Sequence, residues 1–205
     1  MLKNKLPEKS KLKRDFIFIV GASGVGKTTL AKKLFKHYKS TYVEQYMIPE
    51  FLTQDGKKEV TGKLEEKTLF TSMVVLLKNF YKLGYRNVIA LDFNDLRCRD
   101  IPQVFKKYNF ITIKLICSNL DQHRKQMKER KNGLIDFDLL EKSVKKIHKR
   151  CLLINEFQID IANKTADEVF NEAVLLIDRQ QTQQNYRYVK PPKSSFTSWV
   201  LADNL

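Results

Sequence analysis

The spacing of hydrophobic residues changes repeatedly along the chain from residue 15 onward. Short apolar runs of strand length alternate with longer segments in which apolar residues recur with the period of a helix. The predicted strands are residues 16–20, 41–43, 87–91, 110–117 and 157–161, and the predicted helices are residues 27–38, 63–83, 101–108, 120–131, 137–151 and 166–179. Strands that alternate with helices pair in parallel and are covered on both faces, so the pattern predicts an α/β fold built on a parallel sheet.

Two of these helix boundaries carry an additional local signal. Gly84 follows the second predicted helix and suits the left-handed backbone conformation that commonly ends helices. Thr165 precedes the last predicted helix, and Glu168 follows three residues later, which is the spacing of a capping box. These two boundaries are therefore the best defined in the sequence.

The length of the chain favours one folded domain with extensions at both ends. A chain of 205 residues is long enough for one well-buried core and too short for two ordinary domains. We predict a basic leader at residues 1–14, a folded domain at 15–180 and a tail at 181–205, where the periodicity is lost. The tail holds the only tryptophan, Trp199, in an apolar stretch. We expect this stretch to fold back on the domain, to dock on a second copy of the chain, or to order on binding a partner.

Charge and composition narrow the choice of partners and compartment. The formal net charge is +15, which makes nucleic acid an alternative partner, and residues 1–14 and 121–150 carry the densest clusters of Lys and Arg. The three cysteines lie far apart without a CxxC pair, which argues against a disulfide framework or a structural zinc site. The apolar runs are far shorter than the roughly 20 residues of a membrane span. We therefore expect a cytoplasmic protein with no membrane partner.

A glycine-rich stretch, GASGVGKT, lies between the first predicted strand and the first predicted helix and fits the pattern GxxxxGK[ST]. Its glycines allow backbone N–H groups to turn toward a phosphate, and the N-terminus of the following helix adds partial positive charge. We expect Lys27 to reach the β- and γ-phosphates of a nucleoside triphosphate and Thr28 to bind Mg²⁺. The predicted nucleotide-binding residues are Gly21, Ala22, Ser23, Gly24, Val25, Gly26, Lys27, Thr28 and Thr29.

A second acidic ligand for the magnesium ion is expected at the end of a neighbouring strand. The run NVIALDFND places Asp92 at that position, so we assign Asp92 to the magnesium side of the site. Asp95, three residues later, is a weaker candidate for helix capping or substrate contact.

The glycine loop, the strand ending in Asp92, the basic segment near Arg130 and the run QIDIANKTADEVFNEAVLLI together resemble the P-loop kinases of the nucleoside and nucleotide kinase type. Within that group the chain is most similar to compact ATP-dependent small-molecule kinases, often described only as AAA-type ATPases or guanylate-kinase-like proteins. The resemblance implies that residues 15–180 form a P-loop kinase domain, a three-layer α/β/α fold with five parallel strands in the order 2-3-1-4-5. It also implies a mobile lid over ATP and transfer of the γ-phosphoryl group.

The resemblance and the residue chemistry together suggest further catalytic residues. Arg130, with Arg124 as the second candidate, lies in the basic segment where similar kinases present an arginine to the transferring phosphoryl group. Glu44 follows the second predicted strand, where similar kinases often place a carboxylate that orients or deprotonates an acceptor hydroxyl. A phosphate acceptor would instead require cationic groups.

The acceptor itself stays open. The guanylate-binding run of guanylate kinases and the Asp-Arg pair typical of thymidylate kinases are missing from the sequence. A small acceptor such as a nucleoside or nucleotide is the first hypothesis, and a polynucleotide 5′-hydroxyl is the second. The third hypothesis is a nucleotide-dependent switch with no dedicated acceptor. A GTPase is disfavoured because Asn163-Lys164 is not followed by the acidic residue of an NKxD motif.

Overall fold

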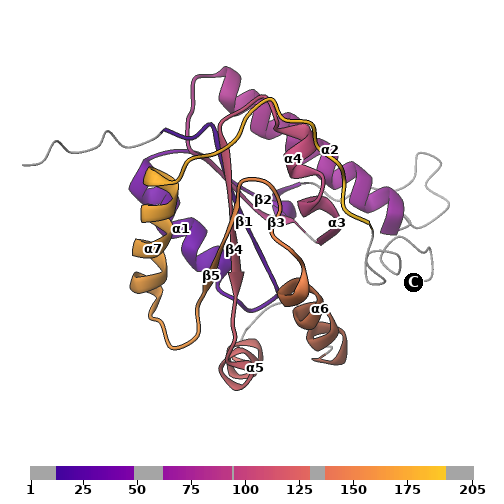
Figure 1. Cartoon of the computed structure of the whole chain (residues 1–205), viewed down its shortest axis with the longest axis vertical. Helices are drawn as coiled ribbons and strands as arrows, with labels where there is room; N and C mark the ends of the chain where they lie inside the picture. Colours follow the sequence, from indigo (N-terminus) through magenta and orange to yellow (C-terminus); the bar gives the residue numbers. More distant parts are fainter. Residues whose placement is uncertain (1–12, 49–61, 94, 130–136, 193–205) are drawn as a thin grey trace, which may run out of the picture.

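The computed structural model describes residues 13–48, 62–93, 95–129 and 137–192. Its centre is a sheet of five parallel strands in the order β2-β3-β1-β4-β5 (Figure 1). The strands are β1 (Phe16–Gly21), β2 (Tyr42–Glu44), β3 (Val88–Phe93), β4 (Phe110–Ile116) and β5 (Glu156–Asp160). The predicted parallel sheet and its strand order are confirmed.

Helices cover both faces of the sheet and form the outer two layers of the fold. One face is covered by α1 (Lys27–Tyr38) and α7 (Ala166–Arg179), and the other by α2 (Gly62–Lys82), α3 (Asp95–Cys98) and α4 (Ile101–Val104). Two further helices, α5 (Leu120–Lys128) and α6 (Phe137–Lys149), lie at the lower end of the sheet in Figure 1. A short 3-10 turn (Gln45–Met47) follows β2.

The apolar run of β1 is buried on both faces, as expected of a central parallel strand. Ile17 and Ile19 pack into the layer of α1 and α7, whereas Phe16 and Phe18 pack into the layer of α2 and α4. The second layer is rich in aromatic contacts, and the rings of Phe16 and Phe105 meet edge to face at 4.8 Å between centroids. The two cores share this strand, so β1 and the loop that follows it have a rigid support.

The two sequence signals for helix ends are confirmed. Gly84, two residues after the last residue of α2, has φ 92°, and its N–H donates to the carbonyl of Tyr81. Thr165 caps α7 through the N–H of Glu168, whose carboxylate accepts from the N–H of Thr165.

Three predicted helices were too long, and two short elements were not predicted. The helices expected at 120–131 and 137–151 end at Lys128 and Lys149. The helix expected at 101–108 ends at Val104, because a turn closed by the N–H of Tyr108 on the carbonyl of Phe105 brings both rings onto Phe16. Helix α3 and the 3-10 turn have only four and three residues. Such short elements do not repeat an apolar position often enough to show a period.

Residues 181–192, the C-terminal strap, form neither helix nor strand but make many contacts with the domain. The strap crosses from α7 toward α4 and α3 and is drawn in yellow in Figure 1. Asn155 and Gln183 exchange two hydrogen bonds of 2.8 Å, and the hydroxyl of Tyr186 donates to the carbonyl of Pro102. The hydroxyl of Tyr188 donates to the carbonyl of Arg99. The stretch that contains Trp199 lies outside the described residues.

Hydrogen bonds from the side chain of Arg14 connect the start of the strap to the sheet. Its side chain is 1% exposed, although the sequence grouped it with the basic leader. The guanidinium donates to the carbonyls of Ile177 and Gln180 at the end of α7, and to the side chains of Asn109 and Thr182. These bonds join the amino ends of β1 and β4 to α7 and the strap.

Within the described residues, no helix is both long and apolar enough to cross a bilayer.

We predict that Arg14→Ala lowers the free energy of unfolding by about 3–5 kcal/mol, because it leaves buried carbonyls and side chains without their donor. The measurement is urea unfolding at pH 7.5. Lys13→Ala, a change in the preceding exposed residue, is the control and should alter stability by less than about 0.5 kcal/mol. Equal midpoints for the two variants would contradict a structural role for the Arg14 bonds.

Candidate nucleotide-binding site

The loop between β1 and α1 begins at Gly21, where its backbone passes close to the backbone of β4. A Cβ atom at this position would lie 2.5 Å from the carbonyl oxygen of Leu115 on β4, closer than any side chain allows. Gly24, at the outer bend, has φ 80°, and its Cβ would lie 2.6 Å from Cγ of Met127. Both positions therefore require glycine, and the loop is confined between β4 and α5.

The loop is followed directly by the first turn of α1. Gly26 is the N-cap residue, with φ 87°, and its carbonyl accepts the first helical hydrogen bond from the N–H of Leu30. The Nζ atom of Lys27 donates to the carbonyl of Ala22 at 3.2 Å, so its ammonium group lies over the loop. Thr28 and Thr29 are exposed in this first turn. A loop of glycines, a lysine and a helix N-terminus together fit the phosphates of a nucleotide.

Two acidic residues lie at the carboxyl ends of β3 and β2, the two strands on one side of β1. The sheet register pairs Glu44 with Leu91 and Leu91 with Ile19, so the ends of β2, β3 and β1 lie side by side. With strands about 4.8 Å apart, the backbone of Glu44 lies about 10 Å from β1. The side chain of Glu44 is 1% exposed. The backbone of Asp92 lies in β3 beside the start of the loop, while its side chain lies outside the described part of the structure.

The donor chemistry of Thr28 and Asp92 fits magnesium. The hydroxyl of Thr28 lies in the exposed first turn of α1, one residue after Lys27. Hydroxyl and carboxylate oxygens are the ligands that Mg²⁺ prefers, usually together with water and phosphate oxygens. Thr28 and Asp92 are therefore of the right chemical type for a magnesium ion beside a bound triphosphate.

Helix α5 supports the loop from the side opposite β1. His123 is 2% exposed, and its Nε2 atom lies 2.8 Å from the carbonyl oxygen of Ser23. A carbonyl can only accept, so Nε2 carries the proton. Burial lowers the pKa of His123 and the charge of Lys27 lowers it further, although the contact with Ser23 opposes both. The imidazole is consequently a neutral donor to the loop near pH 7.

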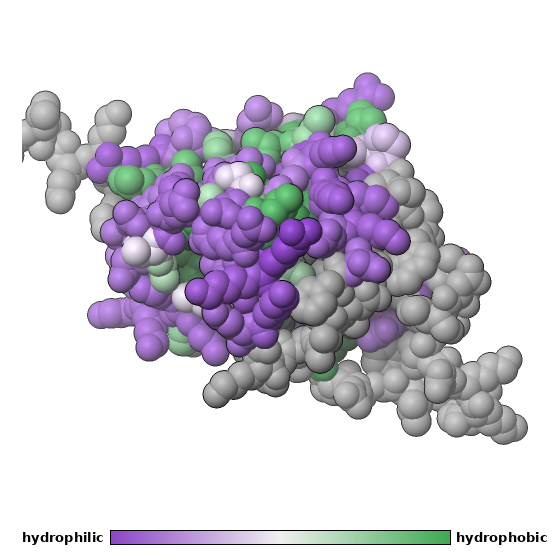
Figure 2. Space-filling model, turned by 90° about the horizontal axis from the view of Figure 1, so that it is seen from below, coloured by the Kyte–Doolittle hydropathy of each residue, from purple (hydrophilic) through white to green (hydrophobic). Residues whose placement is uncertain are grey.

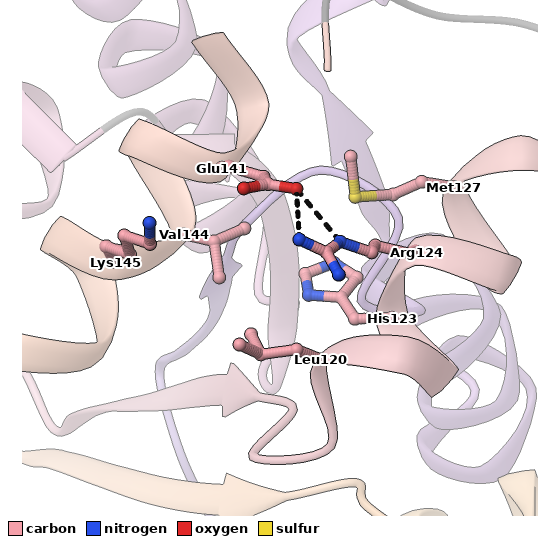
Figure 3. A pocket seen from close by; sticks show the side chains of 7 residues that line it. All are labelled: Leu120, His123, Arg124, Met127, Glu141, Val144 and Lys145. Carbon is pink, nitrogen blue, oxygen red and sulfur yellow. Dashed lines mark hydrogen bonds and ion pairs between the residues drawn. The ribbon is translucent and has the colours of Figure 1, made fainter. Parts of the chain in front are cut away.

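Arg124 points away from this contact and pairs with α6. Its guanidinium contacts one carboxylate oxygen of Glu141 through Nε at 2.9 Å and through Nη2 at 2.8 Å. The hydrogen bond with Glu141 raises the pKa of Arg124. Figure 3 shows this pair at a pocket of about 80 Å³ between the two helices, lined by Leu120, His123, Arg124, Met127, Glu141, Val144 and Lys145. Arg130 lies outside the described residues.

Three residues of this region were not predicted: His123 and Met127, which contact the loop, and Glu141, which pairs with Arg124. Leu120, His123 and Met127 recur at helical spacing, so the sequence alone indicates a buried helix face and not a loop contact. No local signal connects Glu141 to Arg124, because the pair joins two separate helices.

Seen from the end where α5 and α6 lie, the surface is mostly hydrophilic with small hydrophobic areas (Figure 2).

We predict that the protein loses stability as the pH falls from 7.5 to 5.5. Burial lowers the pKa of His123 and of His148, and for His148 the charges of His123 and Lys114 lower it further. The unfolded chain takes up protons near the ordinary histidine pKa of about 6.5, whereas the folded protein takes them up at lower pH. The free energy of unfolding should therefore rise with pH through this window, as urea unfolding at pH 5.5, 6.5 and 7.5 can measure.

The variant His148→Leu should make this pH dependence shallower without loss of stability at pH 7.5. The Nε2 atom of His148 is buried and has no hydrogen-bond partner among the described residues, so an apolar side chain removes a titrating group at little cost. A stability that stays constant or increases on acidification would contradict the assignment.

Comparison with known proteins supports the same architecture. Residues 1–80 match the family model of the NB-ARC domain. No curated protein sequence was found to match the chain. The structure is similar to a gluconokinase from Sinorhizobium meliloti 1021 with a TM-score of 0.57 and 13% sequence identity, over 78% of this chain and 90% of that one. A shikimate kinase from Acinetobacter baumannii gives a TM-score of 0.52 and 14% identity, over 83% and 94% of the two chains.

A thymidylate kinase from Candida albicans is similar over 81% of this chain and 92% of its own length, with a TM-score of 0.55 and 16% identity. The three kinases share the architecture at identities that carry no information about the substrate. The NB-ARC match covers β1, the glycine loop, α1 and β2, the part of the chain that forms the candidate nucleotide site. The resemblance is thus confirmed at the level of architecture: the chain has the P-loop NTPase fold that these small-molecule kinases share.

Proposed function

We propose that the protein is an ATP- and Mg²⁺-dependent phosphotransferase that moves the γ-phosphoryl group to a small acceptor such as a nucleoside or nucleotide. The observation that carries the proposal is the common edge of the sheet. There the glycine loop that follows β1, with Lys27, lies at the same edge as the ends of β3 and β2, which carry Asp92 and Glu44. A phosphate-binding loop beside two strand-end acids is suited to hold a triphosphate on one side and an acceptor on the other.

The donor half of the reaction falls to the loop and the first turn of α1. Backbone N–H groups of residues 24–28 would hold the β- and γ-phosphates, and the ammonium of Lys27 would exchange its contact with Ala22 for phosphate oxygens. Thr28 and Asp92 would hold Mg²⁺, which supplies charge neutralisation for the departing diphosphate when bound. In this arrangement the bond between the γ-phosphorus and the bridging oxygen breaks while a bond to the acceptor oxygen forms.

We assign Glu44 to the reaction of the acceptor. Its carboxyl group is buried at the end of β2, two strands from the loop. In the proposed reaction a carboxylate here accepts the proton that the acceptor hydroxyl loses as it attacks. The names of the similar structures cover a gluconokinase, a shikimate kinase and a thymidylate kinase, so the shared fold does not select the acceptor.

The arginines have separate roles in this proposal. Arg130 remains the first candidate to stabilise the charge of the transferring group. Arg124 is held by Glu141 and by Asp121 and is about half exposed, so it would have to leave Glu141 to reach a phosphate. We therefore assign Arg124 primarily to joining α5 and α6.

A nucleotide-dependent switch is the second candidate function. The observation in its favour is the NB-ARC match, which covers the glycine loop and α1 with Lys27 and Thr28 but ends at residue 80, before β3 and Asp92. A switch binds and hydrolyses the nucleotide without passing the phosphoryl group to a dedicated acceptor.

The cytoplasmic location, a nucleic-acid substrate and a homo-oligomer formed through the tail also remain predictions of the sequence.

We predict that the protein transfers labelled γ-phosphate from ATP to a member of a panel of nucleosides, nucleoside monophosphates, small alcohols and 5′-hydroxyl oligonucleotides. Lys27→Ala should reduce the rate by more than about 100-fold, since it removes a charged donor from the phosphate site. Lys36→Ala, an exposed lysine on the same helix, is the matched control and should retain activity. Lys27-dependent phosphate release with no labelled acceptor would instead establish the switch.

We predict that Glu44→Gln lowers kcat by about 100- to 10,000-fold for an alcohol acceptor and leaves ATP affinity unchanged, because the amide keeps the shape of the side chain but cannot take up the proton. Initial rates and ATP titration on the same preparation separate the two effects. An unchanged kcat would exclude Glu44 as the base.

A further inference from the structure

We propose that His123 is a positioning residue that fixes the Ser23–Gly24 peptide of the glycine loop in its phosphate-binding orientation. The inference rests on the proposed function only in requiring a nucleotide at this loop. It concerns a residue on α5, about 100 positions from the loop in sequence and outside the glycine-rich motif.

The geometry of one peptide plane sets the direction of the Gly24 N–H. In a trans peptide the C=O and the N–H point in opposite directions, because the unit is planar. The carbonyl of Ser23 accepts from Nε2 of His123 at 2.8 Å and so points outward, toward α5. The N–H of Gly24 belongs to the same peptide and must point the other way, into the loop. This is the direction in which a bound phosphate needs a donor.

Glycine at position 24 leaves this peptide plane able to rotate unless a partner holds it. Gly24 has φ 80° and has no side chain, so the preceding peptide can rotate with less steric hindrance than at any other residue type. Met127 fills the space on the outer side of Gly24, which limits the position of its Cα atom but offers no hydrogen bond to the Ser23 carbonyl. The hydrogen bond from His123 selects the outward orientation of the Ser23 carbonyl.

Helix α5 itself is anchored, so the imidazole is a fixed reference point. Asn119 caps the helix by accepting from the N–H of Gln122. The side-chain oxygen of Gln122 accepts in turn from the N–H of Asn163, in the turn after β5. The ring of His123 is buried between this helix and the loop. A buried donor on a fixed helix holds the loop at a low entropic cost on nucleotide binding.

The test compares two replacements of similar length that differ in hydrogen bonding. In glutamine the Nε2 atom is four bonds from Cα, as it is in histidine, so His123→Gln can still donate to Ser23, whereas His123→Met cannot. Binding of a fluorescent ATP analogue with Mg²⁺ should weaken by about 10- to 100-fold in His123→Met and by less than about threefold in His123→Gln. Methionine binding as tightly as wild type, or glutamine binding as weakly as methionine, would overturn the inference.

A second measurement does not depend on the stability of a variant. In the wild-type protein, the Gly24 amide proton should shift downfield when inorganic triphosphate and Mg²⁺ are added, as expected for a new hydrogen bond to an anion. An unchanged Gly24 resonance, with saturation shown by other loop amides, would overturn the proposed orientation. If the wild-type protein binds neither ATP nor triphosphate, the proposed function fails and the inference fails with it. If Lys27→Ala abolishes binding but His123→Met does not, only the inference fails.

Discussion

The close contact between the end of β1 and β4 is the constraint on which the candidate site depends. With only a hydrogen atom at Gly21, the backbone turns away from the sheet beside the carbonyl of Leu115 without separating the two strands. The turn places the next residues over the carboxyl edge of the sheet and starts α1 at Lys27. A side chain at Gly21 would push β1 away from β4, and the buried residues on both faces of β1 would lose packing.

The two edges of the sheet differ in how their polar groups are satisfied. At the amino edge, Arg14 ties β1, β4, α7 and the strap together through buried hydrogen bonds. At the carboxyl edge, the polar groups belong to the glycine loop, Lys27 and the strand-end acids, and the contact of Lys27 with Ala22 is one that a phosphate can replace. The fold thus concentrates rigid polar structure at one edge and exchangeable polar contacts at the other, where ligands bind in open α/β sheets.

The sequence predicted the parts of the fold that repeat a local pattern. All five strands and the helices at 27–38 and 166–179 were predicted within two residues, because their apolar periods run through the whole element. Arg14 was grouped with the leader because its burial depends on α7 and the strap, more than 160 positions away. The contact of His123 with Ser23 and the pairing of Arg124 with Glu141 were not predictable for the same reason. They depend on where separate helices pack.

The structure also changes the meaning of the basic segment at 121–150. Arg150 makes two bonds with Glu156 and its side chain is only 8% exposed, whereas Arg124 pairs with Glu141 and stays about half exposed. Lys125 and Lys128 of α5 and Lys142, Lys145 and Lys149 of α6 are also exposed. Arg150 therefore adds little to an electrostatic footprint for nucleic acid, whereas the exposed lysines of both helices can contribute to one.

The charge of Glu44 bears on which group of the acceptor can react. A buried carboxylate such as Glu44 repels a phosphate group placed next to it, and the repulsion increases as water is excluded. A neutral hydroxyl does not meet this penalty and can donate its hydrogen bond to the carboxylate. If Glu44 faces the acceptor, the reacting group is thus a hydroxyl, and any phosphate that the acceptor carries must lie farther from β2, nearer to basic residues.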